Sequence, residues 1–309
     1  MTTTAPEPTP SEPFAPLAGV RVLSLALNLP GPATLMRCRR LGAHCTKLEA
    51  PPPPAGAPSS DPMAAYNRAA YATLHAGVDV VFANLKTPDG QATLHALLAQ
   101  TDVLITSFRP AASAKLGVAW AAVHARHPHL CLIEIVGAPG ARADAPGHDL
   151  TYLAENDLVT GTDLPATLFA DMAGSLMASE AVLGALLRRA TGGGGVHVVI
   201  ALSEAAGYLA LPRRWGLTQP EGAVGGAHAG YRVYPCADGR VAVAALEPHF
   251  AASLCALAGV ESNGGVMFRS ATHAAIAAFL ATRRCADLDA LALAHDIPLH
   301  TMADHANAS

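Results

Sequence analysis

The chain has 309 residues, of which 51% are hydrophobic and only 14% are charged, with a formal net charge of −4 at pH 7. So many apolar side chains exclude an intrinsically disordered protein, and the length suits one large domain or two ordinary ones. The 20 Lys and Arg residues form no long basic run, so binding to nucleic acid is not expected.

The N-terminus and the cysteines predict the cellular setting. Residues 1–16 are rich in Thr, Pro and Glu, which predicts a disordered tail rather than a signal peptide. No apolar run approaches the ~20 residues needed to cross a membrane, so no membrane association is expected. The six cysteines contain no Cys-x-x-Cys pair, which argues against a zinc knuckle and a disulfide framework and favours a reducing cytoplasm.

Strand-like and helix-compatible segments alternate from Leu17 to Ala210. The expected strands are 19–25, 44–48, 78–86, 103–106, 129–136 and 196–202. The expected helices are 33–41, 62–75, 91–100, 111–124, 172–189 and 203–210. This alternation predicts an α/β fold with a Rossmann-like large domain, 17–210, whose mostly parallel sheet is covered on both faces.

Two local features refine this prediction. The turn after the first strand lacks Gly-x-Gly-x-x-Gly, which counts against a nicotinamide or flavin site and hence against a dehydrogenase. The helix 172–189 is apolar on nearly every face, which predicts a central helix buried all round.

The rest of the chain predicts a linker and a smaller domain. Residues 211–224 are irregular and are expected to link the large domain to a small α+β domain, 225–309. Strands at 231–236 and 240–246 flank an Asp-Gly turn signal and predict a hairpin. Short helices are expected to follow it.

Asp171 and His148 are the first candidate functional residues. Asp171 is expected at the start of a helix, where free N–H groups stabilise negative charge, and Gly174 is expected to leave space for a ligand. An ordinary N-cap, for which Asp is a preferred residue, is the explanation that the local sequence alone favours. His148 follows Pro-Gly and is a candidate base, although it is one of 14 histidines.

Other polar residues carry weaker signals. The histidines of 124–129 lack the i, i+4 spacing of a helical metal site and have no carboxylate among them, so no metal site is predicted. Arg109 is expected at the carboxyl end of a parallel strand, where it could bind a phosphate or remain a solvated loop residue.

The order of motifs along the chain resembles that of the family III CoA-transferases and, within them, the α-methylacyl-CoA racemases. The resemblance covers nearly the whole chain. The matching motifs are Pro16 to Leu23, Leu41 to Glu49, Asn84 to Gly90, Ser107 to Pro110, Gly147 to Asp149, Ala170 to Gly174, Gly225 to Ala227, and Ala245 to Pro248.

The resemblance implies a fold, an assembly and a set of roles. It implies an interlocked homodimer, with each active site between the large domain of one chain and the small domain of the other. The substrate is an acyl-CoA thioester, so CoA belongs to the substrate and no cofactor is expected. The implied catalytic residues are His148, Asp171 and Glu247, and the implied binding residues are Lys86, Arg109, Gly147, Tyr152, Gly225 and Gly226.

The expected reaction is racemisation of 2-methylacyl-CoA thioesters. His148 and Asp171 would act as bases on opposite faces of the α-carbon, and Glu247 would orient His148. One alternative is a CoA-transferase in which Asp171 forms a covalent acyl intermediate. A second is a degenerate, non-catalytic relative, because 74–79 reads Leu-His-Ala-Gly-Val-Asp where the family carries a basic stretch.

Overall fold

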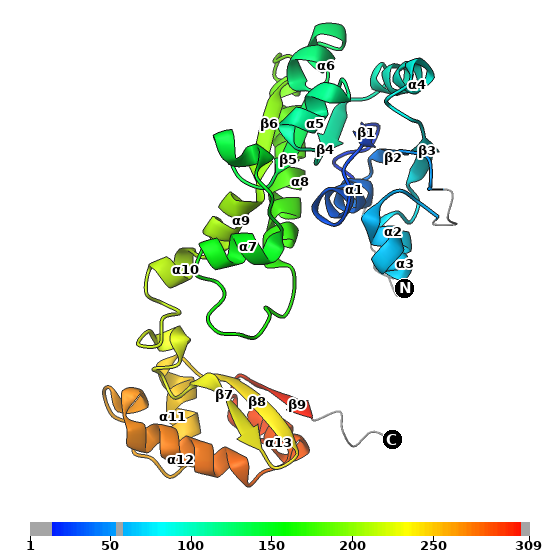
Figure 1. The fold of residues 1–309 in the computed structure, drawn as a ribbon. Helices are drawn as coiled ribbons and strands as arrows, with labels where there is room; N and C mark the ends of the chain where they lie inside the picture. The colour runs from blue at the N-terminus through cyan, green and yellow to red at the C-terminus, as the bar shows by residue number, and fades with distance from the viewer. Residues whose placement is uncertain (1–13, 54–57, 304–309) are drawn as a thin grey trace, which may run out of the picture. The chain divides into compact units, whose positions relative to one another are not determined.

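The computed structural model describes residues 14–53 and 58–303 (Figure 1). The chain forms two compact units, divided between Ala210 and Leu211, and each unit is considered by itself. Most of the tail predicted at 1–16 lies outside the described residues.

The first unit contains a six-stranded parallel sheet in the order β3-β2-β1-β4-β5-β6. This is the order of a doubly wound Rossmann sheet, and it confirms the predicted fold class. The strands are β1 (Arg21–Ser24), β2 (His44–Glu49), β3 (Asp79–Phe82), β4 (Val103–Thr106), β5 (Cys131–Val136) and β6 (His197–Ala201).

Helices connect these strands, and several begin with proline at the first helical position, where its missing N–H costs nothing. The helices are α1 (Pro30–Arg40), α2 (Pro62–Tyr66), α3 (Arg68–Leu74), α4 (Pro88–Leu98), α5 (Pro110–Lys115), α6 (Trp120–Arg126), α7 (Asp149–Glu155), α8 (Phe169–Ala190) and α9 (Leu202–Leu209), with a 3-10 turn η1 (Gly140–Asp144).

The core lies on both faces of the sheet because successive strand residues point to opposite sides. Val22, at one position of β1, packs in a cluster with residues of α1 and α8. Leu23, the next residue, packs in a second cluster with residues of α4 and α6. The near-continuous apolar strands in the sequence follow from this double coverage.

Two of the predicted helices are each divided in the structure. The helix expected at 62–75 breaks at Asn67, whose side chain accepts a hydrogen bond from the Ala70 N–H and so caps α3. The helix expected at 111–124 breaks after Lys115, because Gly117 has a φ of +72° and ends α5 in a left-handed conformation.

The prediction that the helix 172–189 is buried all round is wrong for this unit. α8 packs against α1, α9 and β5, and its buried face consists mainly of small residues. Met172, Leu176, Leu183 and Leu187 are exposed, Leu187 to 68%. Among the described residues α8 alone is long and apolar enough to cross a membrane, and one of its faces packs against α1, α9 and β5 of this unit.

The second unit is built on the predicted hairpin, extended to a three-stranded antiparallel sheet β7-β8-β9. Short helices follow the hairpin as expected, and the sequence did not predict the strand β9, which pairs with β8. A short helix, α10, also occupies part of the predicted linker. The elements are α10 (Leu211–Arg214), η2 (Ala223–Gly225), β7 (Tyr231–Cys236), β8 (Gly239–Ala244), α11 (Pro248–Leu257), η3 (Val266–Phe268), α12 (Ser270–Ala281), α13 (Cys285–His295) and β9 (Leu299–Ala303).

Candidate active site

A cavity of about 230 Å³ lies in the first unit beyond the carboxyl ends of β1, β4 and β5. β1 and β4 are neighbours at the point where the strand order reverses, which is where open α/β sheets bind ligands. Five predicted residues line the cavity. They are Arg109, Gly147, His148, Tyr152 and Asp171.

Asp171 is the third residue of α8 and not its N-cap, so the capping explanation for this aspartate is wrong. The residue is half-buried, and its carboxylate accepts no hydrogen bond from any described residue. Burial, and secondarily the charge of Asp149, raise the pKa of Asp171 to about 7. A carboxyl group with this pKa can both donate and accept a proton near neutral pH.

Asp149 holds the start of α8 against the start of α7. Its buried carboxylate accepts a 2.9 Å hydrogen bond from the Asp171 backbone N–H. The sequence marked Asp149 only as part of the Gly-His-Asp motif. The structure makes it the residue that links the two candidate bases, because His148 immediately precedes it.

His148 is exposed and lines the cavity at the N-terminus of α7. Its backbone is fixed by Thr151, whose hydroxyl accepts a 3.1 Å hydrogen bond from the His148 N–H and donates a 2.7 Å bond to the His148 carbonyl. His148 and Asp171 therefore line one cavity, although they lie 23 positions apart in the chain.

Tyr152 packs against glycine backbone inside the cavity. A Cβ at Gly147 would lie 2.7 Å from the Tyr152 hydroxyl oxygen, and a Cβ at Gly137 would lie 2.2 Å from it. These glycines therefore make room for the Tyr152 ring. Burial and the charge of Asp171 raise the pKa of Tyr152, so its hydroxyl keeps its proton as a hydrogen-bond donor.

The expectation that Gly174 leaves space for a ligand is wrong. A Cβ at Gly174 would lie 2.3 Å from Leu202 Cδ2, so the glycine lets α8 pack closely on α9. Two backbone donors at the start of α8 are also engaged. The Asp171 N–H bonds to Asp149, and the Phe169 N–H bonds to the Thr167 carbonyl.

Asn28 lines the cavity too, and no motif in the sequence pointed to it. It has a left-handed φ of +64°, an uncommon and strained conformation for a residue other than glycine. Its N–H donates a 3.0 Å hydrogen bond to Asp61 Oδ1, and its side-chain oxygen accepts one from the Tyr66 hydroxyl. These two contacts hold the turn between β1 and α1 in place.

Asp61 belongs to a buried polar cluster whose positive charge is Lys47. The Lys47 ammonium bonds to Asp61, lies 3.1 Å from Glu49 Oε1, and donates a 3.0 Å hydrogen bond to His75 Nε2. Burial and Lys47 lower the pKa of His75, which remains neutral. Three residues of this cluster could act as metal ligands by type and distance: Glu49, Asp61 and His75. The Lys47 ammonium, however, already provides the positive charge beside the two carboxylates.

Arg109 and Lys86 are exposed cations near the cavity. Arg109 lines it at the start of α5, after β4. Lys86 lines a neighbouring cavity of about 210 Å³ instead, and Leu27 and Phe108 contribute to both. The sheet therefore presents two adjoining hollows, each with one positively charged side chain.

Glu247, Gly225 and Gly226 belong to the second unit. Glu247 precedes Pro248, the first residue of α11. Gly225 and Gly226 line a cavity of about 700 Å³ in this unit. Gly226 has a φ of +115°, and a Cβ at Gly225 would lie 1.7 Å from the Gln219 carbonyl oxygen, so the backbone itself requires glycine at both positions. The role of Glu247 toward His148 stays a prediction.

The histidines around α6 contact one another and their own protein neighbours. His95 Nδ1 lies 3.1 Å from His127 Nε2, and His197 Nε2 pairs with Glu134 at 2.8 Å. Burial and nearby positive groups lower the pKa of His95 and of His127. Within 14–53 and 58–303, these histidines do not form a group of three clustered metal-ligand atoms.

Comparison with known proteins gives a consistent set of relatives. A "probable fatty acyl-CoA transferase" of Mycobacterium tuberculosis is 30% identical over 212 residues, which are 63% of this chain and 52% of the relative. A succinyl-CoA–D-citramalate CoA-transferase of Chloroflexus aurantiacus is 33% identical over 215 residues, 64% of this chain and 52% of the relative. The α-methylacyl-CoA racemase of Homo sapiens is 26% identical over 265 residues, 80% of this chain and 66% of the relative.

Structural comparison agrees. A crystal structure of a hypothetical protein from Mycobacterium tuberculosis matches with a TM-score of 0.77 at 25% identity, covering 95% of this chain and 86% of that chain. The chain spans about half the length of the Mycobacterium and Chloroflexus curated relatives that it matches. The family model for CoA-transferase family III matches residues 17–308. The chain therefore belongs to CoA-transferase family III, an enzyme family that acts on acyl-CoA thioesters and includes both CoA-transferases and α-methylacyl-CoA racemases.

Proposed function

We propose that the protein interconverts the (R) and (S) forms of a 2-methylacyl-CoA thioester. The observation that carries this proposal is the pairing, in one cavity, of His148 with an Asp171 whose pKa is raised to about 7. An imidazole and a carboxyl group are both side chains that serve enzymes as general acids and bases, so this pair suits proton exchange with a substrate. CoA is part of the substrate, and no separate cofactor is proposed.

In the proposed reaction the thioester carbonyl acidifies the proton on the adjacent carbon. His148 removes this proton from one enantiomer and Asp171 removes it from the other, from the opposite face. The partner group, in its protonated form, then returns a proton to the planar enolate and inverts the centre. The Tyr152 hydroxyl lines the cavity and donates no hydrogen bond to a described residue, so it is the proposed donor to the enolate oxygen.

Positive side chains around the sheet support binding of the CoA phosphates. Arg109 and Lys86 lie at the two adjoining cavities. The segment 74–79 lacks basic residues of its own, but Arg39 of α1 packs on it and donates a 2.8 Å hydrogen bond to the Gly77 carbonyl. A guanidinium therefore accompanies this segment, although Arg39 lines neither of the two cavities.

The proposal includes a homodimer in which Glu247 of the second unit orients His148. The exposed apolar side chains of α8, among them Leu176 and Leu187, support an interface on this helix. Sedimentation velocity should show a dimer, and Glu247→Gln should slow racemisation without abolishing substrate binding.

The test is isotope exchange during incubation of each enantiomer of a 2-methylacyl-CoA in D₂O, followed by mass spectrometry and chiral analysis. Wild-type enzyme should incorporate deuterium at the α-carbon and racemise both enantiomers. His148→Ala and Asp171→Asn should each abolish racemisation. Each variant should still exchange the one enantiomer whose proton faces the remaining base, and the two variants should differ in which one.

His44→Ala is the matched control, because His44 is an exposed histidine of the same sheet, away from the cavity. It should leave exchange and racemisation unchanged. Absence of exchange with several acyl chain lengths, in wild-type enzyme that binds acyl-CoA, would overturn the proposal. Failure to bind CoA or acyl-CoA at all in calorimetry would instead favour a non-catalytic relative.

The alternative function is CoA transfer between carboxylic acids through an acyl–Asp171 anhydride. One observation favours it: the Asp171 carboxylate accepts no hydrogen bond from the described residues, so its oxygens are free to attack a thioester carbonyl. Hydroxylamine should then trap the acylated aspartate, acyl transfer to a free acid should be detectable, and His148→Ala should be mild.

A further inference from the structure

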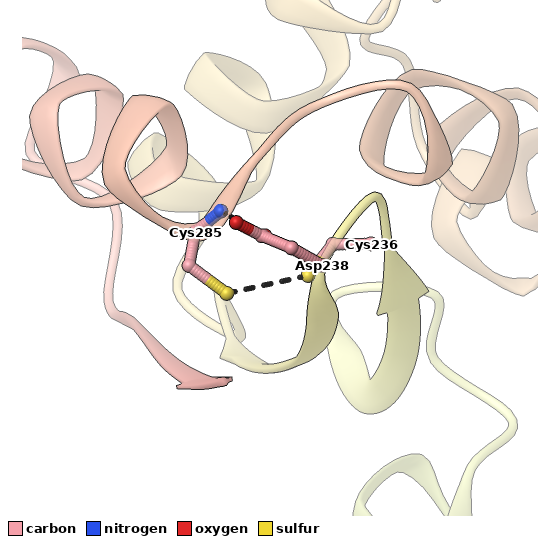
Figure 2. Close-up of side chains that lie close together, drawn as sticks. All are labelled: Cys236, Asp238 and Cys285. Carbon is pink, nitrogen blue, oxygen red and sulfur yellow. Dashed lines mark hydrogen bonds between the residues drawn. The ribbon is translucent and has the colours of Figure 1, made fainter. Parts of the chain in front are cut away.

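Two cysteines and an aspartate converge in the second unit, although 49 residues separate the cysteines (Figure 2). Cys236 ends β7, Asp238 lies in the tight turn to β8, and Cys285 is the first residue of α13. The two sulfur atoms lie 3.6 Å apart. The sulfur atoms and a carboxylate oxygen of Asp238 lie within 4.8 Å of one another.

The backbone holds this arrangement in place. Cys236 pairs with Gly239 across the hairpin, which confines Asp238 to a two-residue turn. The Ala237 N–H donates a 2.8 Å hydrogen bond to the Arg283 carbonyl, and the Cys285 N–H donates a 2.7 Å bond to Asp238 Oδ1. These two hydrogen bonds join the hairpin turn to the start of α13. The two thiols and the Asp238 carboxylate are therefore positioned before any ligand binds.

The spacing matches a tetrahedral thiolate site. Two sulfur ligands, each ~2.3 Å from a zinc ion in tetrahedral geometry, stand about 3.8 Å apart. The observed separation of 3.6 Å is close to this value. Asp238 supplies a third ligand atom, which leaves the fourth position for water, and both Cys236 and Asp238 are partly accessible to solvent for ion entry.

Charges and outer contacts also suit a divalent cation. Two thiolates and one carboxylate carry three negative charges, and Arg284, whose Nε lies 3.3 Å from Asp238 Oδ2, contributes one positive charge. A divalent ion makes the cluster neutral. The Cys285 N–H and Arg284 orient the carboxylate while each of its oxygens keeps a free lone pair, as outer-shell partners of metal ligands do.

We propose that Cys236, Asp238 and Cys285 form a binding site for a thiophilic divalent cation of the Zn²⁺ type in the second unit. This inference is independent of the proposed racemase activity. The sequence alone did not suggest the site, because neither cysteine has a second cysteine within a short spacing.

The experiment is titration of the whole 309-residue chain, in metal-free form, with Co²⁺. A non-chelating phosphine reductant keeps both thiols reduced. Thiolate-to-cobalt charge-transfer absorption should saturate at one ion per chain for this site. Zn²⁺ should then displace the cobalt and remove the absorption. Zn²⁺ should also raise the Tm of the wild-type protein, because it binds the folded state.

Four variants locate the ion. Cys236→Ala and Cys285→Ser should lose the charge-transfer absorption and the Zn²⁺-induced rise in Tm. Asp238→Asn retains the acceptor for the Cys285 N–H and should weaken Zn²⁺ affinity by at least ~10-fold. The control is Asp289→Asn, because Asp289 is another carboxylate of this unit that bonds only Thr301 among the described residues. It should leave the affinity unchanged.

Absence of charge-transfer absorption in reduced wild-type protein would overturn the proposal, and so would equal absorption in Cys236→Ala. Equal Zn²⁺ affinity in the wild type and Asp238→Asn would overturn the assignment of the third ligand. If Cys285→Ser does not fold, Cys236→Ala decides the outcome, since Cys236 is only half-buried.

Discussion

The Asp171 backbone N–H donates a 2.9 Å hydrogen bond to Asp149 Oδ1, so two acidic residues from the starts of α8 and α7 meet beside one cavity. The contact places a negative charge next to the Asp171 carboxyl group. Together with burial, which is the larger effect, that charge raises the pKa of Asp171 to about 7. The same contact fixes His148, the residue before Asp149, at the mouth of the cavity.

Replacing Asp149 by Asn should lower the pKa of Asp171. The amide oxygen still accepts the Asp171 N–H, but the neighbouring negative charge is gone, so the ionised carboxylate becomes less unfavourable. Because burial remains, the pKa should fall only part of the way to its ordinary value. The measurement is a carboxyl ¹³C NMR titration of Asp171. An unchanged pKa would contradict the role assigned to Asp149.

Asp171→Asn should stabilise the protein at alkaline pH. The pKa of Asp171 in the folded state, about 7, lies above its ordinary value of 3.8. Protonated Asp171 therefore contributes its full stability below pH 3.8, and this contribution is lost as the pH rises from there through about 7. An Asn side chain does not ionise, so the variant does not lose stability in this pH range. At about pH 8 the variant should be more stable by roughly 1–3 kcal/mol. Urea unfolding of both proteins at pH 5 and pH 8 measures the difference, which should shrink at the lower pH.

Tyr152→Phe should slow turnover without weakening binding. Removal of one donor to a developing oxyanion typically lowers kcat by about 10²–10³. KM should change little, because the ring still fills the space beside Gly147. Steady-state kinetics test this, with Tyr208→Phe as the control, since Tyr208 is 67% exposed. A change in KM alone would indicate that Tyr152 only binds substrate.

Gly174→Ala should destabilise the first unit by about 1–3 kcal/mol, because the added methyl overlaps Leu202. Gly184→Ala is the matched control on the same helix. No atom lies within 4 Å of a Cβ at Gly184, so this change should be neutral or stabilising by up to ~1 kcal/mol. Chemical denaturation measures both. Equal effects would show that α8 and α9 do not pack closely at Gly174.

Lys47→Met should cost about 3–5 kcal/mol, because it leaves Asp61 and Glu49 buried without their cation. It should also loosen the turn at Asn28, whose N–H bonds to Asp61. Lys115→Met, at an exposed position of α5, should change stability by less than ~0.5 kcal/mol. Thermal unfolding and hydrogen exchange at the Asn28 amide give the two readouts.

The sequence by itself determined the α/β alternation, most strand positions and the strong motifs. Buried parallel strands such as 103–106 are apolar throughout because both faces are covered, so they are recognisable without coordinates. The prolines at the first positions of α1, α2, α4 and α5 set helix starts through backbone geometry that is local to each residue. Gly117 acts in the same local way, but the predicted helix 111–124 ran through it. The candidate residues His148 and Asp171 were found from their motifs.

Only the tertiary structure decided which residues lie in contact and how those contacts change their chemistry. The raised pKa of Asp171 depends on burial and on Asp149, and both arise only when α7 and α8 meet at the sheet. β9 exists because β8 offers it hydrogen-bonding partners, not because Leu299–Ala303 has a strong strand pattern. Cys236 and Cys285, 49 residues apart, become neighbours through the packing of α13 against the hairpin. Local sequence cannot encode such contacts, because their energy comes from groups that only folding brings together.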